Sequence, residues 1–326
     1  MMRSGRGAAA ERLRRGLLLQ PVVPPHSISS NSKQPATMVL LNYQRPPPDG
    51  FATGRYIDQE DRGDVIDESD PRWVPMYNAR ALSPPATLSS HGFACQTWPT
   101  AVTDFDNEGQ LHSEYYEEIV ALVKHASGAT RVVVFDHTRR TTGAVSLNSA
   151  QGGTAAPVPR IHCDYTEDGA PRRLRQLGVK GMDGLSAAEV EAIAAGSGRR
   201  YAFINAWRSL DTSAPVQQHP LAVVDARTVH PSDRFLYELR FPDRTGQNYS
   251  LQFSTQHQWY TYPAMGHEEV LLFTCFDTEE SAPRFVFHSA FDSTSMGTTV
   301  DGAQRVEEAN IPRPRRSLEL RTIAFW

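Results

Sequence analysis

Residues 158–166 read VPRIHCDYT, a short and largely apolar stretch with two polar residues near its end. We expect a strand here, on which side chains two positions apart point to the same face. His162 and Asp164 can therefore present an imidazole and a carboxylate to one ion. Two histidines and a carboxylate on one face, with open positions opposite, are the ligand set of non-haem Fe(II) oxygenases. The pair also occurs by chance at strand ends, so the interpretation depends on a third ligand.

The third ligand is expected on another strand, far along the chain and near in the fold. His288 lies in the apolar stretch RFVFHSA (284–290), where a buried imidazole needs a partner. A core histidine hydrogen-bonded to a neighbour is the alternative interpretation. His257 is the second candidate, whereas His267 resembles a loop residue.

An oxygenase that uses 2-oxoglutarate also needs a cation for the far carboxylate of that cosubstrate. Arginine suits this role because its planar fork binds a carboxylate bidentately. The segment RRSLELR (315–321) places Arg315, Ser317, Glu319 and Arg321 on one face of a strand, and Arg315, Ser317 and Arg321 are the candidates to bind the cosubstrate. Arg284 shares a face with His288 and is a further candidate. The alternative interpretation of residues 315–321 is that their basic side chains are simply exposed to solvent at the start of a strand.

Composition excludes several classes of function. The 326 residues carry a formal net charge of −4, so no basic field attracts nucleic acid or an anionic membrane. No apolar run approaches the roughly 20 residues that span a bilayer. Cys95, Cys163 and Cys275 are far apart, which indicates reduced thiols in an intracellular compartment. We expect a cytoplasmic protein with a small-molecule substrate, no nucleic-acid or membrane partner, and an oligomeric state left open.

The first 37 residues differ from the rest of the chain. They are rich in arginine, end in a Pro/Ser stretch, and contain Glu11 as their one acid. Such a composition also fits a mitochondrial transit peptide. We expect residues 1–37 to be a disordered or dispensable extension, with Met38 as an alternative start. Residues 38–326 are expected to form a single catalytic domain, extended or loop-like up to about residue 75.

Helices are expected early in this domain. Apolar spacing and charge placement predict one at 113–126. Two more are expected at 167–177 and 186–195, and the latter begins with the capping-box pair Ser186 and Glu189. The Gly/Ser/Thr-rich stretch 141–159 resembles a mobile loop, of which residues 141–156 could act as a lid.

Strands dominate the remainder. A buried strand is expected at 131–136. The polar cluster FDHTRR (135–140) at its end lies at a pocket mouth or in a structural turn. Short apolar segments between Pro and Gly clusters predict further strands at 201–207, 221–225, 235–241, 249–253, 270–276, 284–290 and 318–325. We therefore expect a mainly β fold with supporting helices (α+β), a sandwich or jelly roll.

An ordered set of motifs resembles a known family. The motifs are FDHTxR (135–140), HxDxT (162–166), FINxWR (203–208), PLAxxD (220–225), HxW (257–259), CFD (275–277), the histidine at 288 and RxSxExR (315–321). In this order, over residues 38–326, the chain resembles the fungal and bacterial hydroxylase/desaturase family, which includes the gibberellin desaturase and the smaller component of the cephamycin methoxylation system. That family is similar to the Fe(II)/2-oxoglutarate-dependent oxygenases.

The resemblance implies a distorted double-stranded β-helix, a cupin-like jelly roll. It implies His162, Asp164 and His288 as catalytic iron ligands, with 2-oxoglutarate and O2 as cosubstrates. The implied reaction is hydroxylation, desaturation or oxidative ring closure at an unactivated C–H bond. The implied substrate is a small intermediate of fungal secondary metabolism or is derived from an amino acid.

Residues beside the metal pair are expected to shape the substrate pocket, with core packing as the alternative for each. They are Tyr165, Asn205, Trp207, Arg208, Trp259 and Phe287. Two other functions remain open. One is a metal dioxygenase or hydrolase on a similar barrel without the cosubstrate. The other is a non-catalytic homologue that binds a small molecule or a partner protein.

Overall fold

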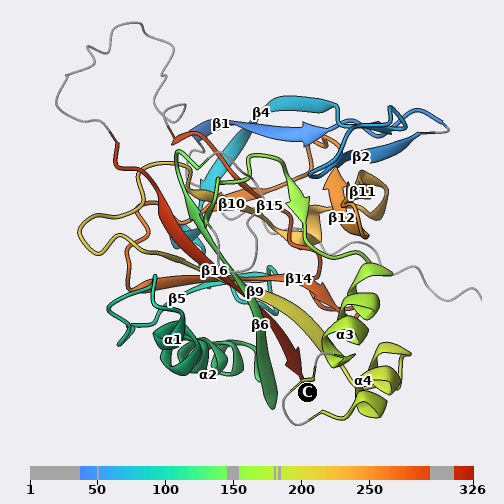
Figure 1. The fold of residues 1–326 in the computed structure, drawn as a ribbon. Coiled ribbons are helices and arrows are strands. Elements are labelled where there is room, and N and C mark those ends of the chain that lie inside the picture. The colour runs from blue at the N-terminus through green and yellow to red at the C-terminus, as the bar shows by residue number, and fades with distance from the viewer. Residues whose placement is uncertain (1–36, 50, 145–153, 180, 183–184, 294–311) are drawn as a thin grey trace, which may run out of the picture. The chain divides into compact units, whose positions relative to one another are not determined.

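The computed structural model describes residues 37–326, apart from 50, 145–153, 180, 183–184 and 294–311 (Figure 1). Residues 1–36 of the expected extension and residues 145–153 of the expected lid lie outside the described residues. Within them the chain forms two β-sheets with a few helices. No described helix is both long and apolar enough to cross a membrane.

The larger sheet has ten strands in the order β1-β4-β13-β10-β15-β8-β12-β11-β2-β3. Their bounds are β1 Thr37–Gln44, β2 Ala52–Tyr56, β3 Val65–Ile66, β4 Ser69–Asn78, β8 His162–Cys163, β10 Leu221–Val224, β11 Arg234–Arg240, β12 Thr245–Leu251, β13 Trp259–Thr261 and β15 His288–Ala290. β1 and β4 pair antiparallel along their length, with Val39, Leu41 and Tyr43 buried at every second position. The segment before residue 75 thus contains paired strands, more structure than the sequence predicted.

The smaller sheet has six strands in the order β5-β14-β9-β16-β6-β7. Their bounds are β5 Phe93–Thr97, β6 Arg131–Thr141, β7 Thr154–Ala155, β9 Tyr201–Ser209, β14 Glu269–Asp277 and β16 Arg316–Phe325. The strands expected at 131–136, 201–207, 270–276 and 318–325 are confirmed within this sheet. β5 was not predicted, because its sequence FACQT has only one β-branched residue, Thr97 at its end.

The main hydrophobic core lies between the two sheets, and a second core covers the other face of the smaller sheet. On β9, Tyr201, Phe203 and Trp207 belong to the main core, whereas Ala202 and Ile204 belong to the second. This alternation follows from the two-residue period of a strand. A mainly β fold with a core between sheets is what the sequence predicted.

Helices cover the second core and one end of the smaller sheet (Figure 1). α1 (Glu108–Gln110), a π-helical turn η2 (Leu111–Tyr115) and α2 (Tyr116–Ser127) run on continuously, which confirms the helix expected at 113–126. Gly128 ends α2 with φ of 72°, a left-handed conformation that glycine adopts without strain. α3 (Gly169–Val179) and α4 (Ala187–Ala194) are also confirmed, the latter with its capping box. Short 3-10 turns are η1 Ala79–Ala81, η3 Ala226–Thr228 and η4 Pro231–Asp233.

The strand expected over 284–290 is wrong in its first half, since only His288–Ala290 pairs. Phe285 has φ of 62°, outside the extended region. The backbone N–H of Val286 donates to the carbonyl of Thr274 in the other sheet at 2.9 Å. The chain therefore crosses between the sheets before His288 joins the larger one.

Candidate active site

His162 and His288 face each other across two antiparallel strands of the larger sheet. β8 and β15 pair at these two residues, and directly opposed residues bring their side chains together. The ring centroids lie 4.4 Å apart. Asp164 follows β8, with Oδ1 3.6 Å from Nε2 of His162. One donor atom from each of these three residues lies within 4.8 Å of the others.

Backbone carbonyls hold both imidazoles. Nδ1 of His162 lies 2.8 Å from the carbonyl oxygen of Arg160, and Nδ1 of His288 lies 3.3 Å from that of Val286. Since a carbonyl only accepts, each Nδ1 carries the proton and each Nε2 keeps its lone pair. Burial, reinforced by His288 and Arg160, holds the pKa of His162 well below its ordinary value. Neutral imidazoles with the outer nitrogen tied to a carbonyl are the form that metals bind.

Asp164 is held in its ionised form. Burial alone would raise its pKa, but the opposing effects, of which the positive charge of Arg321 is the largest, outweigh it, so the pKa lies below its ordinary value. Asn205 Nδ2 donates to Oδ2 at 2.8 Å, and Nε of Arg321 lies 3.5 Å from the same oxygen. Oδ1 remains directed toward His162. The chemistry of this donor set, two neutral imidazoles and one carboxylate, fits Fe(II).

A cavity of about 20 Å³ adjoins the two histidines. Its lining includes Arg140, Leu221, Ala290, Arg315, Glu319 and Arg321. Glu319 and Arg321 are two positions apart on β16, and Arg315 immediately precedes that strand with the same two-residue spacing, as the sequence predicted for one face of a strand. Glu319 and Arg140 were not named among the expected site residues. A carboxylate between Leu318 and Leu320 is a signal that could have identified Glu319 as a site residue, because such groups are rarely buried unless paired.

The two candidate arginines, Arg315 just before β16 and Arg321 within it, differ in their partners. Arg321 lies 3.0 Å from Asp136, 3.1 Å from Glu319 and 3.5 Å from Asp164, so carboxylates surround its charge. Arg315 forms no ion pair with the described carboxylates. Its Nε donates to Ser317 Oγ at 2.9 Å and its Nη1 to the carbonyl of His219 at 2.6 Å.

Arg315 is therefore a buried cation that forms no ion pair with a described carboxylate, although the charge of Glu319 acts on it from a greater distance. Burial, with the neighbouring charge of Arg140, lowers the pKa of Arg315 to about 9. Its guanidinium lies 5.0 Å from the ring centre of Trp207, whose Nε1–H has no described hydrogen-bond partner. A bound carboxylate would balance this charge.

Other expected site residues lie elsewhere. Arg284 is not among the cavity residues and pairs with Glu167 at 2.7 Å. Arg208 lies in the strand next to Trp207 and therefore points to the opposite face, where its Nε donates to Tyr115 Oη at 2.9 Å.

Four aromatic or histidine candidates belong to the packing of the protein. Tyr165 stacks on Phe203 with ring centres 4.1 Å apart, and Phe287 is buried in the main core. Trp259 Nε1 donates to Tyr43 Oη at 2.7 Å. His257 lies 3.1 Å from the same hydroxyl, so the second candidate ligand belongs to this network and not to the group around His162.

The comparisons with known proteins agree with this arrangement. Residues 41–325 match the family model described as an oxidoreductase/YMDC permease-like domain. Hydroxylase/desaturase CTB9 of Cercospora beticola is 28% identical over 330 residues, which cover 94% of this chain and 92% of that protein. The Fe(II)/2-oxoglutarate-dependent dioxygenase nvfI of Aspergillus novofumigatus is 27% identical over 263 residues, 78% of this chain and 84% of that protein.

A solved structure gives the same fold. The iron and alpha-ketoglutarate-dependent endoperoxidase NvfI superposes with a TM-score of 0.68 at 23% identity, over 89% of this chain and 98% of that one. The jelly-roll fold expected from the resemblance is confirmed.

Proposed function

We propose that this chain, which belongs to the oxidoreductase/YMDC permease-like family, is an Fe(II)- and 2-oxoglutarate-dependent oxygenase. The observation that carries the proposal is the cluster of His162, Asp164 and His288, with one donor atom from each within 4.8 Å of the others. Its substrate is a small molecule with an unactivated C–H bond, as the resemblance implies. The outcome is hydroxylation, desaturation or ring closure, depending on how the substrate lies beside the metal.

The three ligands would hold Fe(II) on one face and leave the opposite positions open. Bound iron supplies the activation of O2, with 2-oxoglutarate oxidised to succinate and CO2 as the substrate loses electrons. The protein contributes position and charge. Asn205 and Arg321 orient the carboxylate of Asp164, and the carbonyls of Arg160 and Val286 orient the two imidazoles.

Arg315 and Ser317 would bind the distal carboxylate of 2-oxoglutarate. The guanidinium forms no ion pair with a described carboxylate, and Ser317 Oγ accepts from Arg315 Nε, which leaves the hydroxyl proton free to be donated. Arg321 is less suited because Asp136, Glu319 and Asp164 already surround it. Trp207 Nε1 offers a further donor beside the guanidinium.

The test is an anaerobic titration of the full chain with Fe(II) and 2-oxoglutarate, followed by the visible absorption of their chelate. We expect a band in wild type that His288→Ala abolishes. His230→Ala, at an exposed histidine, is the control and should keep it. Well-folded, iron-loaded protein without the band would contradict the cosubstrate and favour a dioxygenase that does not use it. Protein that binds no iron would contradict the metal centre.

The proposal extends to the chain as a whole. We propose that residues 38–326 are one catalytic domain that acts in the cytoplasm and binds no nucleic acid. The net charge of −4 and the free thiols of all three cysteines support this. Deletion of residues 1–37 should leave the Fe(II)/2-oxoglutarate band unchanged, and a fluorescent fusion of the full chain should remain in the cytosol. Loss of the band, or import into mitochondria, would contradict these two points respectively.

A further inference from the structure

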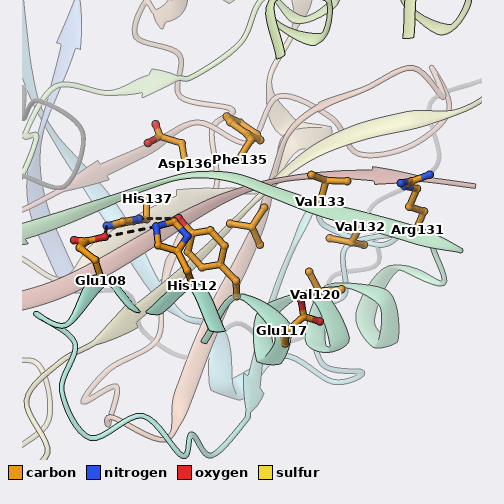
Figure 2. A pocket seen from close by; sticks show the side chains of 12 residues that line it. Glu108, His112, Glu117, Val120, Arg131, Val132, Val133, Phe135, Asp136 and His137 are labelled. Carbon is orange, nitrogen blue, oxygen red and sulfur yellow. Dashed lines mark hydrogen bonds and ion pairs between the residues drawn. The ribbon is translucent and has the colours of Figure 1, made fainter. Parts of the chain in front are cut away.

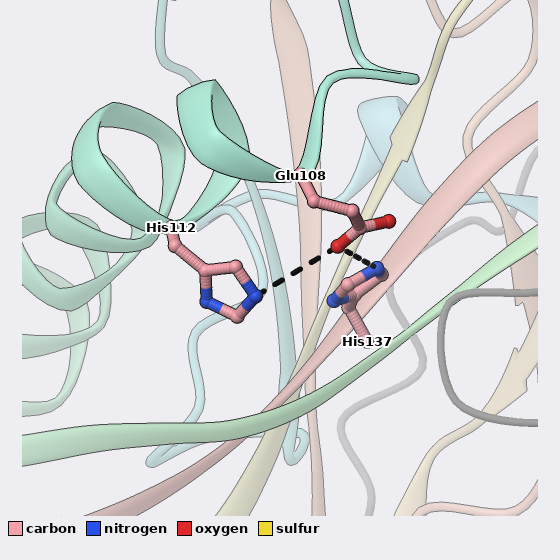
Figure 3. A group of neighbouring side chains, drawn as sticks. All are labelled: Glu108, His112 and His137. Carbon is pink, nitrogen blue, oxygen red and sulfur yellow. Dashed lines mark ion pairs between the residues drawn. The ribbon is translucent and has the colours of Figure 1, made fainter.

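A second group of metal-type donors lies on the other side of β6. Glu108 comes from α1, His112 from η2 and His137 from β6, and their side chains converge (Figure 3). We propose that Glu108, His112 and His137 bind a zinc-type divalent cation, separate from the site at His162.

A bulge in β6 places His137 here. The register between β6 and β16 shifts so that Asp136 pairs with Arg321 and Val134 with Thr322, which leaves Phe135 as the extra residue. Before the bulge, Val132 and Val134 pack in the second core under α2. An extra residue exchanges the faces of the strand, so His137 joins the helical side.

The spacing of the donor atoms suits one small cation. Oε2 of Glu108 lies 3.5 Å from Nε2 of His137 and 3.7 Å from Nε2 of His112. All three donor atoms lie within 4.8 Å of one another. Tetrahedral Zn²⁺ with bonds of ~2.0–2.1 Å holds its ligand atoms about 3.3 Å apart. The two shorter distances need only a few tenths of an ångström of adjustment.

The second, independent observation is the state of His137. Its side chain is only 5% exposed, and its Nε2 has no described hydrogen-bond partner. Nδ1 lies 2.8 Å from Tyr116 Oη, a phenol whose pKa burial raises to about 12 and which therefore stays neutral. When Nδ1–H donates to this oxygen, the lone pair of Nε2 faces the carboxylate of Glu108. A cation between these two atoms turns a repulsive contact into two bonds, with Tyr116 orienting the imidazole.

Glu108 is oriented for this role. Its Oε1 accepts from Arg139 Nη1 at 2.7 Å, which leaves Oε2 directed at both imidazoles. The donor set of two imidazoles and one carboxylate suits zinc, copper or nickel better than magnesium or calcium.

The site opens to the surface, which gives an ion access. A hollow of about 980 Å³ lies over this part of β6, with Glu117 and Asp136 also on its lining (Figure 2). Glu108 and His112 are exposed, whereas His137 forms the floor. The fourth position of the cation is therefore open to water.

The test measures metal content. Full-length protein is stripped with a chelator, dialysed against buffered Zn²⁺ and analysed by mass spectrometry of the metal. We expect wild type to hold one more Zn²⁺ per chain than His112→Ala. Glu108→Gln should lower the affinity of the site for this Zn²⁺ at least tenfold. Glu117→Gln removes an acid beside the same hollow and should match wild type. His112 and Glu108 are exposed, so neither variant should impair folding.

The test depends on the difference in Zn²⁺ content between wild type and His112→Ala. Any Zn²⁺ bound by His162, Asp164 and His288 is the same in both proteins and cancels. Equal Zn²⁺ content in the two proteins would overturn the proposal, as would an equal loss in Glu117→Gln. His112→Ala should also keep the Fe(II)/2-oxoglutarate band, which separates this site from the proposed active site.

Discussion

Replacing Arg315 by methionine removes the proposed anchor of 2-oxoglutarate but keeps an apolar stem beside Trp207. The guanidinium donates to Ser317 Oγ and to the carbonyl of His219, and no described carboxylate pairs with it. A carboxylate ligand would meet a buried, preorganised cation, where charge-assisted hydrogen bonds are at their strongest. The substitution therefore affects the ligand more than the fold.

The expected loss of affinity follows from the burial of the pair that Arg315 would form with the distal carboxylate of 2-oxoglutarate. Truncating one partner of a buried, hydrogen-bonded charge pair costs about 2–5 kcal/mol. At 1.4 kcal/mol per factor of ten, the Kd for 2-oxoglutarate should rise by about 30-fold to more than 1,000-fold. The free energy of unfolding without ligand should change by only about 1–2 kcal/mol. The loss of two hydrogen bonds is offset by removal of a buried charge without an ion-pair partner among the described carboxylates.

Anaerobic calorimetry of iron-loaded protein measures this Kd, and urea unfolding measures the stability. Arg284→Met is the matched control, because Arg284 pairs with Glu167 and does not line the cavity. A Kd in folded Arg315→Met within about threefold of wild type would refute the assignment. A large loss of affinity in Arg284→Met alone would move the role to that residue.

Three further outcomes are expected. Asn205→Ala should weaken Fe(II) binding about 10- to 100-fold in a chelator competition, since it removes the 2.8 Å hydrogen bond to the carboxylate ligand; unchanged affinity would contradict that role. Burial lowers the pKa of His257, so the unfolded chain takes up a proton below about pH 6.5 that the folded protein does not. The free energy of unfolding should therefore be highest above that pH and fall as the pH drops below it. His257→Gln should reduce this pH dependence by up to about 1.4 kcal/mol per pH unit, measured by urea unfolding at pH 5.5 and 7.5. Gly128→Ala should cost about 1 kcal/mol because φ is 72°, whereas Gly266→Ala, in open space without a positive φ, should stay within about 0.5 kcal/mol by the same measurement.

Local spacing was enough to predict part of the site. The two-residue period of a strand places Arg315, Ser317 and Glu319 on one face, and the structure has them so. It also predicts that His162 and Asp164 share a face, although Asp164 lies just beyond the end of β8. Such patterns depend only on backbone geometry within one element, so no knowledge of the rest of the fold is required.

Relations between distant segments were harder to predict. His288 was chosen over His257 because of its apolar surroundings, yet both are buried. Their surroundings differ because β15 pairs with β8, whereas His257 lies against Tyr43 of β1. The choice between Arg315 and Arg321 is of the same kind. Both side chains share a face, and only the carboxylates brought to Arg321 from other segments distinguish them.

The sequence by itself therefore determined the mainly β class, most strands and the two-residue pairing of site residues. Those properties arise from hydrophobic periods that are local to each segment. Only the tertiary structure decided which side chains meet, because strand partners and the bulge at Phe135 depend on contacts far apart in the chain. A single extra residue there reverses the faces of β6, turning Arg140 toward the active-site cavity and His137 toward Glu108.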